Sequence, residues 1–208
     1  MPANIQRVLV FPKLQRITHW LIAGGVIFQL LSAWLVQNAN VDVLAWSDWH
    51  TMIGQALTLP LLLRLALFFI AGPTYWRAFI PSKGQYQLLQ DTLKFYASLG
   101  RRPCPDWHSY NPVWQPLYLL MIALLILTTV SGLAFGLGPD IASWHGSLAA
   151  LVLYFTLAHL FFSVLHDVKG NGAQISAMLN GYKYFQSREA TTKISAEKSV
   201  SIDSLLKK

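Results

Sequence analysis

The sequence predicts an all-α integral membrane protein built as a four-transmembrane-helix bundle. Three observations lead to this fold class. Four separate apolar segments are each long enough to cross a bilayer as a helix, which takes about 20 residues. Only 12% of the residues are charged and the mean hydropathy is +0.40, whereas a soluble domain usually has about twice that charged fraction. The basic residues are also absent from two of the three loops that join the segments.

The first half of the chain contains two predicted spans and an amphipathic segment. The first span is predicted over residues 16–36 and the second over 49–71, with Gly72 and Pro73 marking its end. Pro60 should kink the second span, because proline lacks an amide hydrogen and clashes with the preceding turn. Residues 84–99 favour a helix that lies at the membrane interface rather than a span, because their apolar face is only partial.

The second half of the chain contains the other two spans and a polar tail. The third span is predicted over residues 113–136, with Gly138 and Pro139 marking the turn after it, and the fourth over 144–166. The membrane domain is expected to occupy residues 1–186. Residues 187–208 are expected to form a polar cytoplasmic tail, disordered from Thr191 onward.

The distribution of charge predicts the orientation. The loops after the first and third spans contain no Lys or Arg, and the basic residues lie up to Arg16, between Arg64 and Arg102, or from Lys169 onward. The positive-inside rule then places both termini and the middle loop in the cytoplasm and the two short loops outside. The net charge of +7 reflects this topology, and no nucleic-acid partner is expected.

Four histidines lie in the predicted spans at two depths. His145 and His159 are 14 residues apart on the fourth span, which separates them by about 21 Å of rise but only about 40° of rotation. His19 begins the first span from the cytoplasmic side and pairs by depth with His159, while His50 begins the second span from the outer side and pairs with His145. Ionisable groups inside a membrane are costly and usually functional. The two depth-matched pairs therefore favour axial ligation of two haems b over four unrelated helix caps.

Other features limit the cofactor chemistry. No C-x-x-C-H motif occurs, which excludes c-type attachment, and the single Cys104 excludes both an internal disulfide and a cysteine-ligated iron–sulfur cluster. His166 lies about 10 Å beyond His159 on the same stripe. It could replace His159 as a ligand, although a helix-end histidine at the surface is the favoured interpretation. His108 is expected to be a solvated residue of the cytoplasmic loop.

Arg64 is the one charged residue inside the apolar part of the second span. A buried guanidinium needs an anion, and no acid lies at its depth in the four spans. A haem propionate would provide a bidentate partner. The alternative is that the side chain snorkels to lipid phosphates on the cytoplasmic side.

Several glycines lie near the four histidines. They would allow a porphyrin to approach the backbone closely, or they could simply mediate tight helix packing, which is common in membranes. These residues are Gly24, Gly25, Gly54, Gly132 and Gly146.

Several segments resemble the cytochrome b (gamma) subunits of bacterial formate dehydrogenase, nickel–iron hydrogenase and thiosulfate reductase. These segments are ITHWLIAGGVIF, WHTMIG, FIPSK, SYNPVWQPLYLLMIALLILTTVSG and HGSLAALVLYFTLAHLFFSVLHDVKG. Together they cover about residues 10–185. The resemblance implies four spans around two non-covalently bound haems b, in a bacterial inner membrane. It also implies that His50 and His145 bind the outer haem and that His19 and His159 bind the inner haem.

The resemblance further implies a quinone site beside His159 and Asn111. The Gly-Gln pair that follows the Asn in the family is Val113-Trp114 here, so the contacts to a quinone must differ, and Trp114 could stack on the quinone ring. The alternative is that Tyr110 and Asn111 are only turn and helix-start residues.

The expected function is that of a di-haem cytochrome b subunit, which passes electrons between a periplasmic redox partner and the quinone pool. The partner would hold an iron–sulfur or cytochrome c centre and belong to a hydrogenase, formate dehydrogenase or similar enzyme. The chain itself has no cysteine cluster, phosphate loop or hydrolytic triad. One alternative is a stand-alone di-haem b-type cytochrome that takes electrons from an outer-face donor to quinone. A second, non-redox alternative is a haem transporter or a structural membrane anchor.

Overall fold

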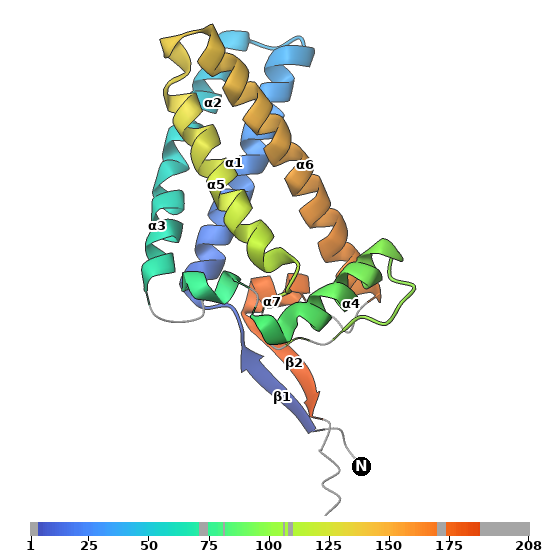
Figure 1. The fold of residues 1–208 in the computed structure, drawn as a ribbon. Coiled ribbons are helices and arrows are strands. Elements are labelled where there is room, and N and C mark those ends of the chain that lie inside the picture. Colours follow the sequence, from blue (N-terminus) through green and yellow to red (C-terminus); the bar gives the residue numbers. More distant parts are fainter. Residues whose placement is uncertain are drawn as a thin grey trace, which may run out of the picture.

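The computed structural model describes residues 4–70, 75–80, 82–105, 107, 110–169 and 174–187. Four helical units form its bundle: α1 (Lys13–Asn38), α2 (Val43–Ala56) continued by α3 (Thr58–Phe69), α5 (Trp114–Leu133) and α6 (Pro139–Lys169) (Figure 1). All four are long and apolar enough to cross a membrane. The prediction of four helical spans is therefore confirmed.

The bundle has a small apolar core and a largely apolar outer surface. Its central cluster takes one residue from each unit: Val26, Leu61, Leu125 and Val152. Apolar side chains that are more than half exposed occur on all four units, among them Leu21, Leu62, Val130 and Leu157. Apolar patches of this extent are rare on monomeric soluble proteins, so the outer surface suits a lipid environment.

The second span is interrupted at Leu57. Helix α2 ends at Ala56 and α3 begins at Thr58, because Pro60 has no N–H to donate to the carbonyl of Ala56. The ladder resumes where Leu61 N donates to Leu57 O at 3.2 Å. Pro60 thus interrupts the helix near the predicted kink, while Gly72 and Pro73, predicted to end the span, lie outside the described residues.

Two helices begin several residues before the predicted starts of their spans. Helix α2 begins at Val43 rather than at residue 49, because the Asp42 carboxylate accepts the N–H of Ala45 and caps the helix. Helix α6 begins at Pro139 rather than at residue 144, since proline fits the first helical turn. His50 and His145 therefore lie in the second turns of their helices and do not begin them.

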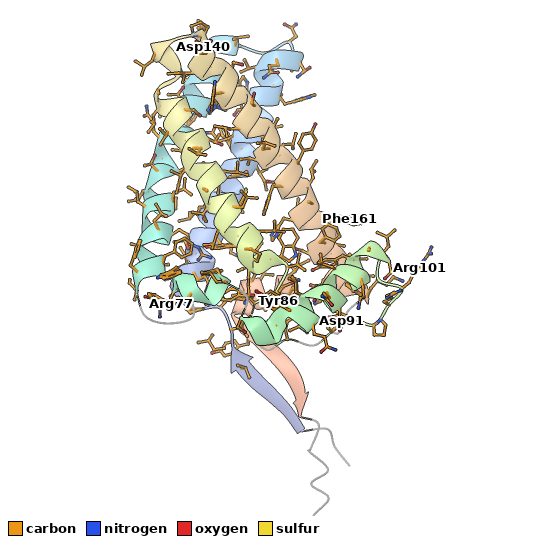
Figure 2. All side chains as sticks on the ribbon, viewed as in Figure 1. Arg77, Tyr86, Asp91, Arg101, Asp140 and Phe161 are labelled. Carbon is orange, nitrogen blue, oxygen red and sulfur yellow. The ribbon has the colours of Figure 1, made fainter. Side chains whose placement is uncertain are left out.

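Helix α4 (Tyr86–Ala97) lies across one end of the bundle (Figure 1), after the short 3-10 helices η1 (Trp76–Phe79) and η2 (Lys83–Gln85). The predicted helix within residues 84–99 is confirmed, and its interfacial position remains a prediction. The opposite end holds η3 (Phe135–Leu137), which joins α5 to α6. Figure 2 shows Arg77 and Arg101 at the α4 end and Asp140 at the opposite end. The positive-inside rule expects basic residues at one end of the bundle, as these positions have them.

A small unit outside the bundle was not predicted. Strands β1 (Asn4–Leu9) and β2 (Tyr182–Ser187) pair antiparallel, from Asn4 with Ser187 to Leu9 with Tyr182, and α7 (Gln174–Asn180) precedes β2. At the turn between α7 and β2, Gly181 has a φ of 93°, and its carbonyl accepts the N–H groups of Val10 and Phe11. The strands extend from the α4 end (Figure 1), so the first and last described segments of the chain lie at the same end of the bundle.

Candidate functional site

Two pairs of histidine rings lie inside the bundle at different heights. The ring centroids of His19 on α1 and His159 on α6 are 6.3 Å apart. The ring centroids of His50 on α2 and His145 on α6 are also 6.3 Å apart. The structure thus brings together both pairs that depth alone predicted. All four rings are half-buried.

The spacing of each pair suits a single metal ion between the rings. A metal bound by one nitrogen of each imidazole at about 2 Å places the ring centroids about 6 Å apart. Among the described residues no group of three or more His, Cys, Asp or Glu side chains could hold a metal ion. A bare ion would lack ligands at either pair, whereas a macrocycle that supplies its own in-plane nitrogens needs two axial histidines at most. The donor set therefore fits haem.

In each pair one histidine lies on α6, and the other lies on a helix that is not a close neighbour of α6. In the described part of the chain, α6 packs closely on α5, η3 and α7, and α1 and α2 are not among its close neighbours. The paired side chains span this separation between helices. This arrangement is compatible with a flat group held between the helices by axial side chains.

The outer pair has one ring nitrogen of each histidine fixed by a serine. Ser32 Oγ lies 2.8 Å from His50 Nδ1 and donates its own hydrogen to the Gln29 carbonyl at 3.1 Å. With that hydrogen on the Gln29 carbonyl, the Ser32 oxygen accepts from His50 Nδ1–H, and His50 Nε2 keeps its lone pair. This is the usual second-sphere arrangement of a metal-binding histidine.

The same arrangement recurs at the other histidine of this pair. His145 Nδ1 lies 3.0 Å from the Thr128 carbonyl and 3.2 Å from Ser131 Oγ, and Ser131 donates to the Thr128 carbonyl. Because a carbonyl can only accept, His145 Nδ1 carries the hydrogen and Nε2 is the free acceptor. Both outer histidines are thus in the tautomer that binds a metal through Nε2.

Arg64 lies beside the inner pair and is only 3% exposed. Its Nη1 donates to the Gln15 carbonyl at 3.2 Å and to Thr18 Oγ1 at 3.3 Å, and its Nε donates to the Tyr118 hydroxyl. These partners are neutral. Among the described residues no carboxylate forms an ion pair with Arg64, so this buried cation is not neutralised within the chain described. The burial does not match the snorkelling alternative and leaves Arg64 suited to an anionic group such as a propionate.

His166 lies in the last turn of α6, as the helix-end interpretation predicted, and its side chain is buried. Its Nδ1 lies 3.5 Å from Cys104 Sγ, and its ring packs on Trp107 at a centroid distance of 4.6 Å. The segment between α4 and α5 covers it. His166 has no ring contact with His19, which agrees with the prediction that His159 is the inner partner. His108 lies outside the described residues.

The glycines near the histidines differ in what they contact. A Cβ on Gly25 would clash with the Leu57 side chain, and one on Gly54 with Gln29 Nε2, which favours the helix-packing interpretation. A Cβ on Gly132 would come within 2.9 Å of His145 Cε1. Gly132 therefore lets the His145 ring lie against α5. Gly24 and Gly146 have no such neighbour within 4 Å.

An apolar cavity of about 440 Å³ lies between α4, α5 and α6, beside the inner pair. The Trp114 ring forms part of its wall and meets the His159 ring edge-on at a centroid distance of 5.2 Å. The remaining lining residues are Leu93, Tyr96, Ala97, Val113, Leu117, Phe155, Ala158 and Phe162. A flat hydrophobic molecule of moderate size would fit this cavity.

Asn111 is placed behind the cavity wall and acts on Tyr96. Its Oδ1 accepts the N–H of Val113 at 3.0 Å, which fixes the amide with Nδ2 directed to the Tyr96 hydroxyl, 2.5 Å away. Trp114 Nε1, which can only donate, lies 3.2 Å from the same hydroxyl. The helix-start interpretation of Asn111 thus accounts for its Oδ1 atom. Its Nδ2 atom instead contacts Tyr96, which lines the cavity.

The Tyr96 hydroxyl accepts two hydrogen bonds, so its own hydrogen is directed to neither donor. Burial raises the pKa of Tyr96 above its ordinary value, and the group remains a neutral donor. Sequence reasoning missed this role. The amphipathic pattern of residues 84–99 could indicate that Tyr96 faces inward, but not which polar groups it meets.

Comparisons with known proteins identify relatives over nearly the whole chain. The family model described as "Prokaryotic cytochrome b561" matches residues 10–181. A "Probable Ni/Fe-hydrogenase B-type cytochrome subunit" of Rhizobium leguminosarum bv. viciae is 23% identical, over 88% of this chain and 92% of the relative. A "Probable Ni/Fe-hydrogenase 1 B-type cytochrome subunit" of Escherichia coli (strain K12) is also 23% identical, over 86% and 92%. A similarly named protein of Bradyrhizobium diazoefficiens is 22% identical, over 86% and 87%. No solved structure matches significantly.

Proposed function

Because the chain belongs to the prokaryotic cytochrome b561 family, we propose that it binds two haems b, one at each histidine pair. Membership already implies a membrane cytochrome that binds haem b and serves electron transport, and the predicted family is confirmed. His19 and His159 would hold the inner haem, and His50 and His145 the outer one. The observation that supports this most strongly is the equal 6.3 Å separation of the two ring pairs.

When bound, haem supplies one-electron redox chemistry at an iron held by axial histidines. The chain provides the ligands, their orientation and their surroundings. Ser32 and Ser131 hold the outer imidazoles with Nε2 available. Arg64 provides a buried positive charge beside the inner pair, where it would neutralise a propionate. The apolar helices keep water away from both pairs.

The redox partner is proposed to be a hydrogenase that docks at the end of the bundle near His50 and His145. The relatives are named as subunits of nickel–iron hydrogenases, and they match the chain over most of both lengths. That end carries Asp42 and Asp140 and is the periplasmic end under the positive-inside rule. An iron–sulfur or cytochrome c centre of the partner would exchange electrons with the outer haem. Because the relatives are named as hydrogenase subunits, a subunit role is favoured over a stand-alone cytochrome.

Quinone is proposed as the redox substrate at the cytoplasmic end, in the cavity between α4, α5 and α6. The cavity is apolar, as a quinone ring and its isoprenoid chain require, and it adjoins His159 through the Trp114 ring. The Tyr96 hydrogen has no acceptor among the groups that bond this hydroxyl, and a quinone carbonyl would provide one. Asn111 would then act by orienting Tyr96.

Reduction of the haems by quinol tests this proposal. The full chain, purified with its haem, is mixed with a short-chain naphthoquinol, and haem b reduction is followed by absorbance. Ala97→Trp fills the cavity from α4, and Gln90→Trp adds the same ring to an exposed position of that helix as a control. Reduction should be fast in the unmodified protein and the control, and at least about tenfold slower in the cavity variant. Equal rates in all three proteins would contradict the site.

A further inference from the structure

A second cavity lies on the outside of the bundle, where α1 begins. It has a volume of about 430 Å³ and combines two basic side chains with an apolar wall. Lys13, Arg16, Ile17, Trp20 and Leu21 come from the first turns of α1, and Leu179 comes from α7. From Lys13 to Leu21 the helix rises about 12 Å. The cavity therefore changes from charged to apolar along the direction in which α1 enters the membrane.

The charge in this cavity lacks a counterion among the described residues. Helix α1 has no acidic residue in its first turn and no side-chain cap at Pro12, and no ion pair of Lys13 or Arg16 occurs among the described residues. The first N–H groups of α1 add partial positive charge to that of Lys13 and Arg16. A single anionic group would be stabilised by all three sources.

The Arg16 guanidinium is held in place. Its Nη1 donates to the Leu179 carbonyl, and its Nε is buried without a hydrogen-bond partner. A Cβ on Gly181 would lie 3.2 Å from Arg16 Nε, so the absence of a side chain there leaves room for the guanidinium. A buried N–H without an acceptor is costly. Arg16 is thus fixed beside the cavity, where its positive charge lines the wall.

The apolar wall begins directly below the two cations. Trp20 Nε1 donates to the Met178 carbonyl at 3.1 Å, which fixes the indole at the level where tryptophan lies in membrane proteins. Ile17, Leu21 and Leu179 are each between 44% and 61% exposed and surround this ring. An occupant must be anionic at one end and apolar along the next several ångströms.

From this charge and shape we propose that the cavity binds one anionic phospholipid. Lys13 and Arg16 would hold the phosphate, and the acyl chains would lie along Ile17, Trp20 and Leu21. The lipid would also contact α7 through Leu179, and so would join the first span to the terminal unit of α7, β1 and β2. A basic pocket at the end of a span is the expected form of a lipid headgroup site.

Native mass spectrometry of the full, haem-loaded chain in detergent tests this proposal. The probes are phosphatidylglycerol, phosphatidylcholine and inorganic phosphate. Lys13→Gln together with Arg16→Gln should weaken phosphatidylglycerol binding roughly tenfold to thirtyfold, since each cation near the headgroup contributes to affinity. The double substitution Arg101→Gln and Arg102→Gln removes the same charge from exposed positions of the α4 end. It should leave phosphatidylglycerol binding unchanged.

Lys13→Gln alone guards against a folding defect, because Lys13 is exposed and leaves the Arg16–Leu179 bond intact. It should weaken phosphatidylglycerol binding about fivefold. Equal binding of phosphatidylcholine and phosphatidylglycerol would overturn the proposal in favour of a merely apolar groove. Displacement of the lipid by millimolar phosphate would identify a site for free anions instead. An equal loss in the Arg101/Arg102 variant would place the lipid elsewhere.

Discussion

The Ser32 hydroxyl lies 2.8 Å from Nδ1 of His50 and fixes the tautomer of that ring, since its own hydrogen is donated to the Gln29 carbonyl. Ser131 stands in the same relation to His145 and the Thr128 carbonyl. The two outer histidines are on different helices, yet each is oriented by a serine bonded to the carbonyl three residues before it. A common demand on both rings, such as one metal between them, explains the repetition.

Ser32→Ala should weaken the binding of the outer haem. Without the acceptor at Nδ1, the His50 ring can rotate and change tautomer, and such losses typically cost tenfold to a hundredfold in metal affinity. The rate of haem transfer to apomyoglobin should rise about tenfold for one of two haems. Ser147→Ala removes a serine of α6 that bonds only the Ser143 carbonyl, and it should leave both rates unchanged. Equal transfer rates in the two variants would count against the tautomer argument.

Arg64→Gln should lower the midpoint potential of the inner haem. A buried positive charge stabilises the reduced over the oxidised iron, so its removal favours oxidation, by on the order of 50 mV. Redox titration should show this shift in one of two one-electron transitions. Arg64→Lys keeps the charge and should shift the potential less, while Arg77→Gln removes an exposed arginine at the same end (Figure 2). An unchanged titration curve for Arg64→Gln would rule out the propionate contact.

Tyr96→Phe should remove one hydrogen bond to a bound quinone. Infrared difference spectra of the protein with a carbonyl-labelled quinone should show one carbonyl band at higher frequency, and binding should weaken about fivefold to tenfold. Tyr86→Phe alters an exposed tyrosine on the same helix (Figure 2) and should have neither effect. Quinone that binds Tyr96→Phe with both carbonyl bands unshifted would remove Tyr96 from the site, and absence of quinone binding in the unmodified protein would instead contradict the substrate.

Lys183 gives a pH dependence to the terminal unit. Burial lowers its pKa to about 8 from the ordinary 10.5, against opposing effects of Asp167 and Cys104. Between these values the unfolded chain binds more protons than the folded one, so stability rises with pH. From pH 7.5 to 9.5 the gain should be on the order of 2 kcal/mol. Thermal unfolding of the full chain in detergent should show this rise, and Lys183→Met should not. An identical rise in both proteins would assign it to other groups.

The pairing of the four histidines could be predicted because it depends on regular properties of the sequence. Helical rise and the distribution of basic residues gave the depth of each histidine, and depth was enough to match His19 with His159 and His50 with His145. The helix boundaries were less predictable, since the start of α2 depends on one capping side chain, Asp42, which lay in the expected loop.

Contacts between distant segments could not be predicted from periodicity. Strand β1 pairs with β2 at the other end of the sequence, and no local pattern indicates that partner. The burial of His166 depends on Trp107 and Cys104, which come from an irregular segment. The role of Tyr96 depends on the orientation of the Asn111 amide, which Val113 N–H decides. Each of these needs tertiary structure.

The number of haems b in each chain tests the account most directly. It is measured by haem extraction against protein concentration, together with a redox titration of the purified full chain. The account predicts two haems and two one-electron transitions. It predicts one haem after alanine substitution of any member of either pair, namely His19, His50, His145 or His159. His166→Ala should retain both, because its ring lies on Trp107 and Cys104 instead. A single haem in the unmodified protein, or two retained without His19 or His50, would contradict the central claim.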